Sequence, residues 1–312
     1  MIDIAVKQLN CKQKDLAKML GVSSAQISKW KKGEYISHDM ENKLSELAGI
    51  GGLIPDFVYL SNGIENANKW ENLICHIADV AIDMSETGYD SAPLSDEREL
   101  LCFSVFDTIT SAGLEIPNSF PKDLDLDYDD GEWLEKSTEN VIGNTIFELL
   151  QSLDDVYGFY AAYISPLCDG NNEEILEIDG ELYSGLIELA LCKISPETSK
   201  LLPKFDHTRF ETLGWYEKKL RRLRVLAYEE GKPLKTEILD LVALDHESLS
   251  VEAEREALGI NNSRLHPDVY MDEILKSHRI IHQVLPLICK KLGITDEELR
   301  EVIDLKEPRL KI

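Results

Sequence analysis

One short stretch near the N-terminus narrows most what this chain can fold into. Residues 13–33 read QKDLAKMLGVSSAQISKWKKG, and Leu16, Ala17 and Leu20 fall on one face of a helix. Ala17 is small enough to let a second helix cross closely. Gly21 stands where the first helix must end, because glycine readily takes the left-handed conformation that closes a helix. The stretch therefore predicts a helix that stops abruptly and is followed by a tight turn.

A second helix is predicted directly after this turn. Ser23 is placed to cap it by accepting a hydrogen bond from a free backbone N–H. Ile27 and Trp30 project to one side, and Gly33 ends the helix. The opposite side starts with small or hydrogen-bonding groups and ends with lysines: Ser24, Ala25, Ser28, Lys29 and Lys32. A helix that enters the DNA major groove needs small polar groups toward the bases and cations toward the phosphates.

Four sequence elements together resemble the phage-repressor and Cro-like (XRE-type) helix-turn-helix family: Gln-x-x-Leu-Ala, Gly-Val-Ser, Ile-Ser-x-Trp and a following Gly. The resemblance covers roughly residues 4–50 and implies a DNA-binding domain of four to five short helices. It implies that Gln13 touches the DNA backbone beside the groove. It also implies base-edge reading and phosphate contacts by a set of recognition-helix residues. The base readers would be Ser24, Ala25 and Lys29, with Gln26 and Ser28 nearby, and the phosphate contacts Ser23 and Lys32.

The chain departs from the family pattern after the tryptophan. Many members have a glutamate there, whereas this chain has Lys31, so any salt bridge of that acid is absent. Two interpretations of Lys31 remain open, a phosphate contact and a solvated side chain. Ala25 offers only a methyl group, which suits contact with a thymine methyl but carries little specificity.

Charge is distributed unevenly along the chain, whose net charge is −25 at pH 7. Residues 1–50 hold eight lysines and six acidic residues, a net of +2, so the remainder carries −25 − 2 = −27. Residues 12–32 contain six lysines and a single acidic residue, Asp15. DNA phosphates attract a locally basic module and repel an acidic one. The pattern therefore predicts a DNA-binding module joined to an acidic body.

The sequence beyond the basic module predicts a larger helical domain. Residues 49–63 have the Gly, Pro and Asn-Gly content of a connection. From residue 66 onward apolar residues recur at helical spacing, so we expect about eight to ten helices. We predict an all-α protein with a helix-turn-helix domain and linker at residues 1–62. An all-α acidic domain for oligomerisation, or for effector or partner binding, is predicted at residues 63–312.

Two local features of this second domain leave alternatives open. The Asp-Gly pair within residues 173–189 fits a β-hairpin or a helix-turn-helix equally well. Ser137, Thr138 and Asn140 are candidate starts for the long apolar helix that follows them.

Three clusters in the sequence are candidate sites. His278 and His282 have the spacing of two metal ligands on a helix, but no third ligand accompanies them. The acidic run at residues 123–130 resembles the start of a calcium loop, yet it lacks the glycine at the sixth position and the glutamate at the twelfth. The basic run at residues 218–224 either extends the DNA footprint or pairs with nearby carboxylates, the latter being favoured. We predict no catalytic, cofactor or metal site.

The six cysteines are scattered and none forms a Cys-x-x-Cys pair, which favours free thiols in a reduced cytosolic protein over disulfides or zinc. No stretch approaches the roughly 20 consecutive apolar residues of a membrane-spanning helix. The start of the chain lacks the pattern of a secretory signal. We therefore predict a cytoplasmic protein with no membrane partner.

The favoured function is that of a sequence-specific transcriptional regulator, a repressor, that binds double-stranded DNA as a homodimer. One alternative is an effector-gated receptor regulator that senses a peptide or small molecule. A second alternative is an antitoxin-like protein that binds a protein partner and uses DNA only for autoregulation. No nucleophile–base set, phosphate loop or metal cluster in the sequence supports an enzyme.

Overall fold

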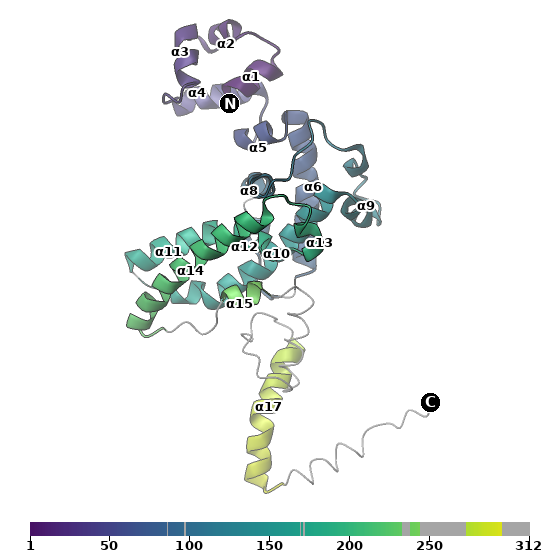
Figure 1. Ribbon diagram of the computed structural model, residues 1–312, viewed down its shortest axis with the longest axis vertical. Coiled ribbons are helices and arrows are strands. Elements are labelled where there is room, and N and C mark those ends of the chain that lie inside the picture. Colours follow the sequence, from purple (N-terminus) through teal and green to yellow (C-terminus); the bar gives the residue numbers. More distant parts are fainter. Residues whose placement is uncertain are drawn as a thin grey trace.

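The computed structural model describes residues 1–85, 87–96, 98–168, 170, 172–232, 238–243 and 273–294. All regular structure in these ranges is helical, which confirms the all-α prediction. Figure 1 shows the N-terminal helices at one end of the molecule and α17 at the opposite end. The four N-terminal helices are α1 (Ile2–Gln8), α2 (Gln13–Leu20), α3 (Ser24–Trp30) and α4 (His38–Ala48).

The helices α1–α4 enclose a small core. Leu16, Ile27 and Leu44 are fully buried, one from each of α2, α3 and α4. Gly21 closes α2 with a φ of 71°, the left-handed conformation that its position in the sequence predicts. The sharp turn places α3 across α2, as the sequence anticipates.

The predicted connection at residues 49–63 contains a further helix, α5 (Pro55–Leu60). Its Phe57 is fully buried, and the Phe57 ring meets the Phe106 ring edge-to-face with centroids 5.0 Å apart. The connection is therefore part of the hydrophobic core. No periodic pattern predicts α5, because its 6 residues make fewer than two helical turns.

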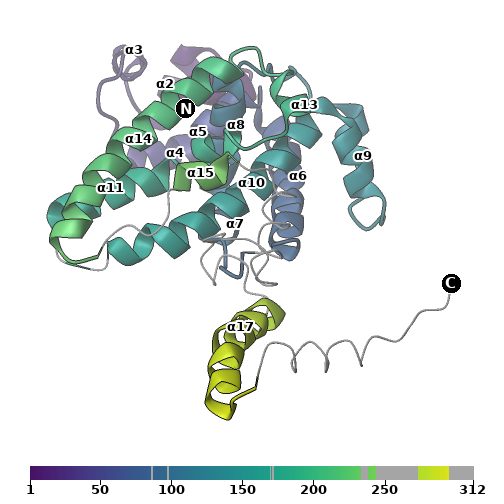
Figure 2. The ribbon, with the colours of Figure 1, turned by 60° about the horizontal axis from the view of Figure 1, so that its bottom comes forward.

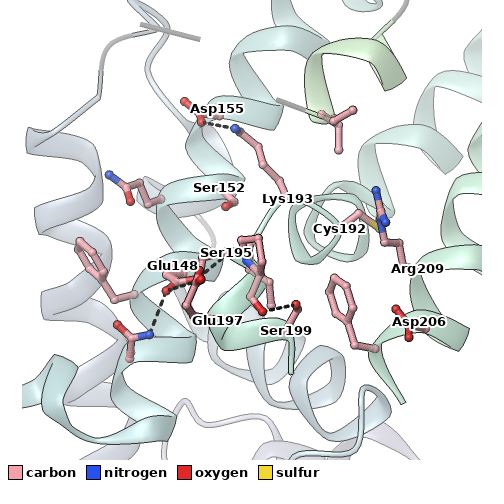
Figure 3. Close-up of a pocket in the computed structure, with 18 residues that line it drawn as sticks. Glu148, Ser152, Asp155, Cys192, Lys193, Ser195, Glu197, Ser199, Asp206 and Arg209 are labelled. Carbon is pink, nitrogen blue, oxygen red and sulfur yellow. Dashed lines mark hydrogen bonds and ion pairs between the residues drawn. The ribbon is translucent and has the colours of Figure 1, made fainter. Parts of the chain in front are cut away.

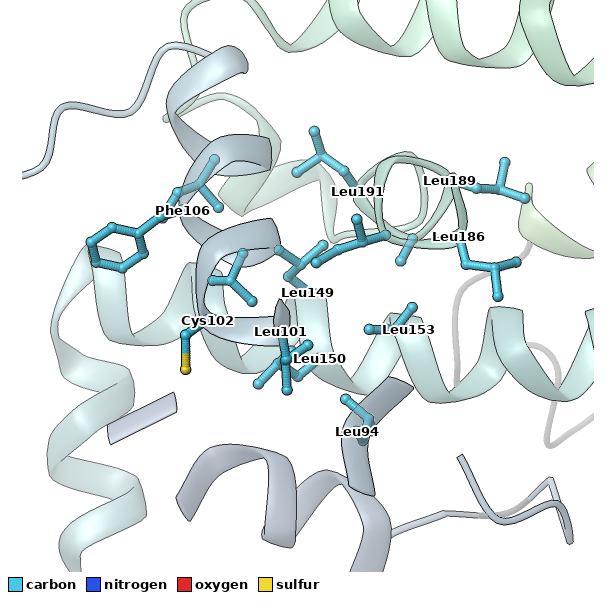
Figure 4. Close-up of a cluster of buried hydrophobic side chains, with 14 of the residues drawn as sticks. Leu94, Leu101, Cys102, Phe106, Leu149, Leu150, Leu153, Leu186, Leu189 and Leu191 are labelled. Carbon is cyan, nitrogen blue, oxygen red and sulfur yellow. The ribbon is translucent and has the colours of Figure 1, made fainter. Parts of the chain in front are cut away.

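The body is built around α10 (Val141–Tyr163), which is buried on most sides. Its neighbours include α6 (Ile64–Asp83), α8 (Arg98–Ser111) and α12 (Leu186–Leu191). Leucines from α8, α10 and α12 interlock between these helices (Figure 4). The remaining elements are α7 (Ala92–Ser95), η1 (Lys122–Leu124), α9 (Trp133–Glu139), η2 (Ser165–Leu167), α11 (Glu173–Ser184), α13 (Pro196–Ser199), α14 (Phe205–Glu229) and α15 (Ile238–Val242).

The structure resolves the two local alternatives in the body. Asn140 starts α10, because its side chain accepts hydrogen bonds from the backbone N–H groups of Ile142, at 2.8 Å, and Gly143, at 3.3 Å. A Cβ at Gly143 would lie 2.1 Å from the Ser137 carbonyl oxygen, so only glycine allows this tight corner between α9 and α10. The β-hairpin interpretation of residues 173–189 is wrong, since α11 runs straight through the Asp-Gly pair.

The last described helix, α17 (Glu273–Leu292), is drawn apart from the body in both views (Figures 1 and 2). Large apolar side chains are exposed on it: Ile280, Ile281, Val284, Leu285, Leu287, Ile288 and Leu292. Pro286 lies inside the helix. Among the described residues, no helix combines the length and the apolar character needed to cross a membrane.

Candidate nucleic-acid interface and body pocket

The start of α3 is fixed by the predicted cap. Ser23 has an extended backbone, and its Oγ accepts a hydrogen bond from the Gln26 N–H at 3.1 Å. This bond satisfies one of the donors that every helix N-terminus leaves free. The cap therefore sets the point at which α3 begins and hence which side chains face outward.

Gln13 ties the start of α2 to the outer side of α3. The Gln13 Nε2 donates to the Ser28 Oγ at 2.8 Å and approaches the Ser24 carbonyl oxygen at 3.4 Å. The Ser28 hydroxyl in turn donates to the Ser24 carbonyl oxygen at 3.0 Å. Gln13 and Ser28 are thus held in one network, so a ligand that engages either side chain meets a pre-oriented group.

Most of the sequence-predicted DNA contacts are open to solvent. Gln13 and Gln26 are half-buried, and the other predicted residues are exposed: Ser23, Ser24, Ala25, Ser28, Lys29, Lys31 and Lys32. Ile27 of α3 takes the inward position and is fully buried, and Gln13 of α2 reaches Ser28 on the outer side of α3. Whether each of the predicted residues contacts DNA stays a prediction.

The three lysines at the end of α3 differ in their surroundings. The Lys29 Nζ lies 3.5 Å from a carboxylate oxygen of Glu34, and both side chains are more than half exposed. Lys31 pairs with Asp3 of α1, a contact that the sequence did not indicate, and its contact with a DNA phosphate stays a prediction. Lys32 makes no ion pair within the part of the chain that the structure describes.

The other candidate clusters have partners in the structure or lie outside the described residues. In the acidic loop, Asp125 pairs with Lys69 and Asp130 with Lys136, each at 2.6 Å. No group of three or more potential metal ligands occurs among the described residues. The side chains of His278 and His282 lie outside the described residues.

The basic run on α14 pairs with carboxylates, as the favoured interpretation expected. The Arg222 guanidinium is bidentate to Glu174, at 2.6 and 2.7 Å. Lys219 pairs with Glu181 of α11, and Arg221 with Glu217 one turn earlier on α14. The pairs of Arg222 and Lys219 link α14 to α11, whereas the Arg221 pair lies within α14.

A pocket of about 740 Å³ opens in the body between α10, the α12–α13 connection, α14 and α15. This volume falls in the range of small-molecule sites. Figure 3 shows polar and charged side chains around it, and the walls also include two aromatic rings, Phe147 and Phe205. On α14, Asp206 and Arg209 are exposed at the pocket, as is Glu197 of α13.

A buried ion pair forms one side of this pocket. The Lys193 Nζ lies 3.3 Å from an Asp155 carboxylate oxygen, and each side chain is only 1% exposed. Nearby, the Glu148 carboxylate accepts hydrogen bonds from the Ser195 N–H at 2.9 Å and the Thr198 hydroxyl at 2.7 Å. Burying such charges costs free energy unless each is paired, so these contacts fix the pocket wall. The sequence pattern did not predict this site, although two adjacent acids, Asp154 and Asp155, lie inside an apolar helical run.

A helix-turn-helix family model matches residues 3–49. These residues form an XRE-type helix-turn-helix domain, in agreement with the resemblance read from the sequence. No curated protein matches the chain, and no solved structure matches it. The family is a DNA-binding regulatory domain, so the chain carries the DNA-binding part of a transcription regulator.

Proposed function

We propose that this protein is a sequence-specific transcriptional repressor that binds double-stranded DNA as a homodimer. The observation that carries the proposal is the exposed outer face of the capped helix α3, tied to α2 through Gln13. On this face, Ser24, Ala25 and Lys29 read base edges, with Gln26 and Ser28 beside them. Ser23, Lys31, Lys32 and Gln13 contact the DNA backbone.

The charge distribution favours sequence-specific contacts by this face over non-specific attraction of the whole protein to DNA. The net charge of the whole chain is −25 at pH 7, so its overall charge repels DNA. Six lysines between Lys12 and Lys32 against one acid supply a local attraction. The acidic body then opposes binding wherever the α3 contacts are poor.

The homodimer is supported by the exposed apolar face of α17. Single helix-turn-helix modules need a second copy to reach useful affinity. Helical geometry places Ile281 and Ile288 within about 20° of each other on one face, whereas Gln283 and Lys290 lie opposite. A soluble monomer rarely exposes so continuous an apolar surface. In the proposed dimer two copies of α17 pack through this face.

Selection of bound sites from random duplex DNA tests the proposed function. We expect two half-sites of related sequence, about 34–36 Å or a multiple apart, since a two-fold dimer reads one helical turn per subunit. Recovery of no enriched sequence would refute sequence-specific binding, and a single unpaired site would refute the symmetric dimer.

The dimer is tested in the full chain by two variants with the same change of charge. Ile281→Glu with Ile288→Glu adds two negative charges to the apolar face. Gln283→Glu with Lys290→Gln makes the net charge equally more negative on the opposite face. Light scattering should give a monomer for the first variant and a dimer for the second. A wild-type monomer at tens of micromolar, or a first variant that stays dimeric, would remove α17 as the dimer contact.

The body pocket favours a second candidate function, effector-gated regulation. Arg209 beside Asp206 and Glu197, with two aromatic walls, suits a zwitterion such as a short peptide. Short peptides should raise the melting temperature of the full chain and change its DNA affinity. Arg209→Ala should abolish both effects, and Arg221→Ala, a control on the same helix outside the pocket, should not. If both variants responded equally to the peptides, this pocket would be excluded as the peptide-binding site.

A further inference from the structure

Two cysteines that lie far apart in the sequence meet between α6 and α8. The thiols of Cys75, on α6, and Cys102, on α8, are joined by a hydrogen bond. Cys75 is partly exposed, whereas Cys102 is 1% exposed and lies at the edge of the leucine cluster (Figure 4). One thiol of the pair is therefore accessible from solvent and the other is protected.

A guanidinium lies beside the accessible thiol. Arg98, at the start of α8, donates from Nη1 to the Cys75 carbonyl oxygen at 3.5 Å and also hydrogen-bonds the Cys75 thiol. Asp79, one turn after Cys75 on α6, pairs with the same guanidinium and holds it there. Arg98 is thus placed to stabilise a negative charge on the Cys75 sulfur.

The surrounding groups act differently on the two thiols. The hydrogen bond with Cys102 lowers the pKa of Cys75 to about 7, helped by Arg98 and opposed by burial and by the charge of Glu71. The hydrogen bond with Cys75, burial, and the charges of Cys75 and Glu71 all raise the pKa of Cys102, against the opposing charge of Arg98. Cys75 is the thiol that ionises, and Cys102 stays protonated beside it.

We propose that Cys75 and Cys102 are a peroxide-reactive pair, in which Cys75 is oxidised first and Cys102 then closes a disulfide to it. The Cys75 thiolate attacks one oxygen of hydrogen peroxide, forming an S–O bond and breaking the O–O bond. The leaving hydroxide takes a proton and becomes water, and Cys75 becomes a sulfenic acid.

The second step joins the two sulfurs. The Cys102 sulfur attacks the Cys75 sulfur, the S–O bond breaks, and the departing hydroxide leaves as water with the Cys102 proton. Once Cys75 is oxidised, its negative charge no longer disfavours ionisation of Cys102. In sum, two thiols lose two electrons, and one peroxide becomes two waters. The product cross-links α6 to α8.

The test treats the reduced full-length protein with hydrogen peroxide at about pH 7, blocks the remaining thiols by alkylation, and identifies the peptides by mass spectrometry. We expect a linked Cys75–Cys102 peptide. Cys75 should be oxidised faster than Cys11 of the same chain, because Arg98 and the hydrogen bond with Cys102 stabilise the Cys75 thiolate. Oxidation of Cys75 no faster than that of Cys11 in the same digest would overturn the proposal.

Variants separate the two roles. Cys102→Ser should leave Cys75 as a sulfenic acid that dimedone traps, and Cys75→Ser should leave Cys102 unreacted. Arg98→Gln should move the pH at which oxidation reaches half its maximal rate upward, and Arg98→Lys, which keeps the charge, should largely restore it. The absence of a cross-link in the wild type, or an unchanged pH profile in Arg98→Gln, would overturn the assignment.

Discussion

Replacing Lys29 and Lys32 separately distinguishes base reading from phosphate attraction on α3. Lys29→Ala removes a side chain that the proposal places against a base edge, and Lys32→Ala removes one that it places against a phosphate. The structure adds a complication for Lys29, whose ammonium lies 3.5 Å from Glu34. The Glu34→Gln variant is therefore needed as a control for the loss of that pair.

The magnitudes expected for the two lysines differ in kind. A base contact by Lys29 is worth about 1–3 kcal/mol of discrimination, or roughly 5- to 150-fold at one position of each half-site. The exposed pair with Glu34 contributes at most about 1 kcal/mol, so its loss does not hide this effect. Each phosphate contact, such as that of Lys32, makes DNA affinity fall by a further factor of roughly 3.5 when salt rises from about 50 to about 200 mM.

Fluorescence anisotropy measures both effects on the selected operator, its single-base variants and random duplex DNA over a salt series. Lys29→Ala should flatten the preference at one position, with a smaller loss on other sequences. Lys32→Ala should weaken all sequences alike and reduce the salt slope by about one contact. Equal, uniform losses from both variants would refute base reading by Lys29. Specificity would then rest on the remaining α3 side chains or on DNA shape.

Three further predictions concern stability and charge. Phe57→Ala should lower the free energy of unfolding by about 3–5 kcal/mol in urea denaturation, whereas Tyr59→Ala, on an exposed side chain of the same helix, should change it by less than about 0.5 kcal/mol; equal effects would show that α5 is not anchored in the core. Ser23→Ala should cost about 1 kcal/mol and Ser23→Gly only a few tenths, measured by thermal unfolding, and a neutral alanine variant would contradict the cap. Residues 1–62 alone should bind random duplex DNA more tightly than the full chain, because the acidic body is gone; an unchanged affinity would exclude repulsion by the body.

The sequence alone determined the helix-turn-helix unit, because its signals are local. Gly21 ends α2, Ser23 caps α3, and the buried Ile27 sets which side of α3 faces outward, each within a few residues of the others. Such contacts are decided by backbone conformation and helical spacing, which a short stretch of sequence contains. The all-α class of the described body followed from the same periodicity.

Partners that are distant in the chain could not be predicted in this way. The pairing of Lys31 with Asp3 depends on how α1 packs against α3, so the sequence left Lys31 between two interpretations. The connection at residues 49–63 contains α5, and Phe57 is buried there because a ring from α8 lies against it. Nothing in the local sequence distinguishes this phenylalanine from one in an exposed loop.

The pocket and the thiol pair were decided by tertiary structure alone. Asp155 and Lys193 lie on separate elements and are drawn together beside the pocket, where each charge offsets the desolvation of the other. Cys75 and Cys102 are scattered cysteines in the sequence, and only the packing of α8 on α6 brings their sulfurs into contact. Local sequence sets helix starts, ends and faces, whereas long-range packing decides which buried charges and thiols meet.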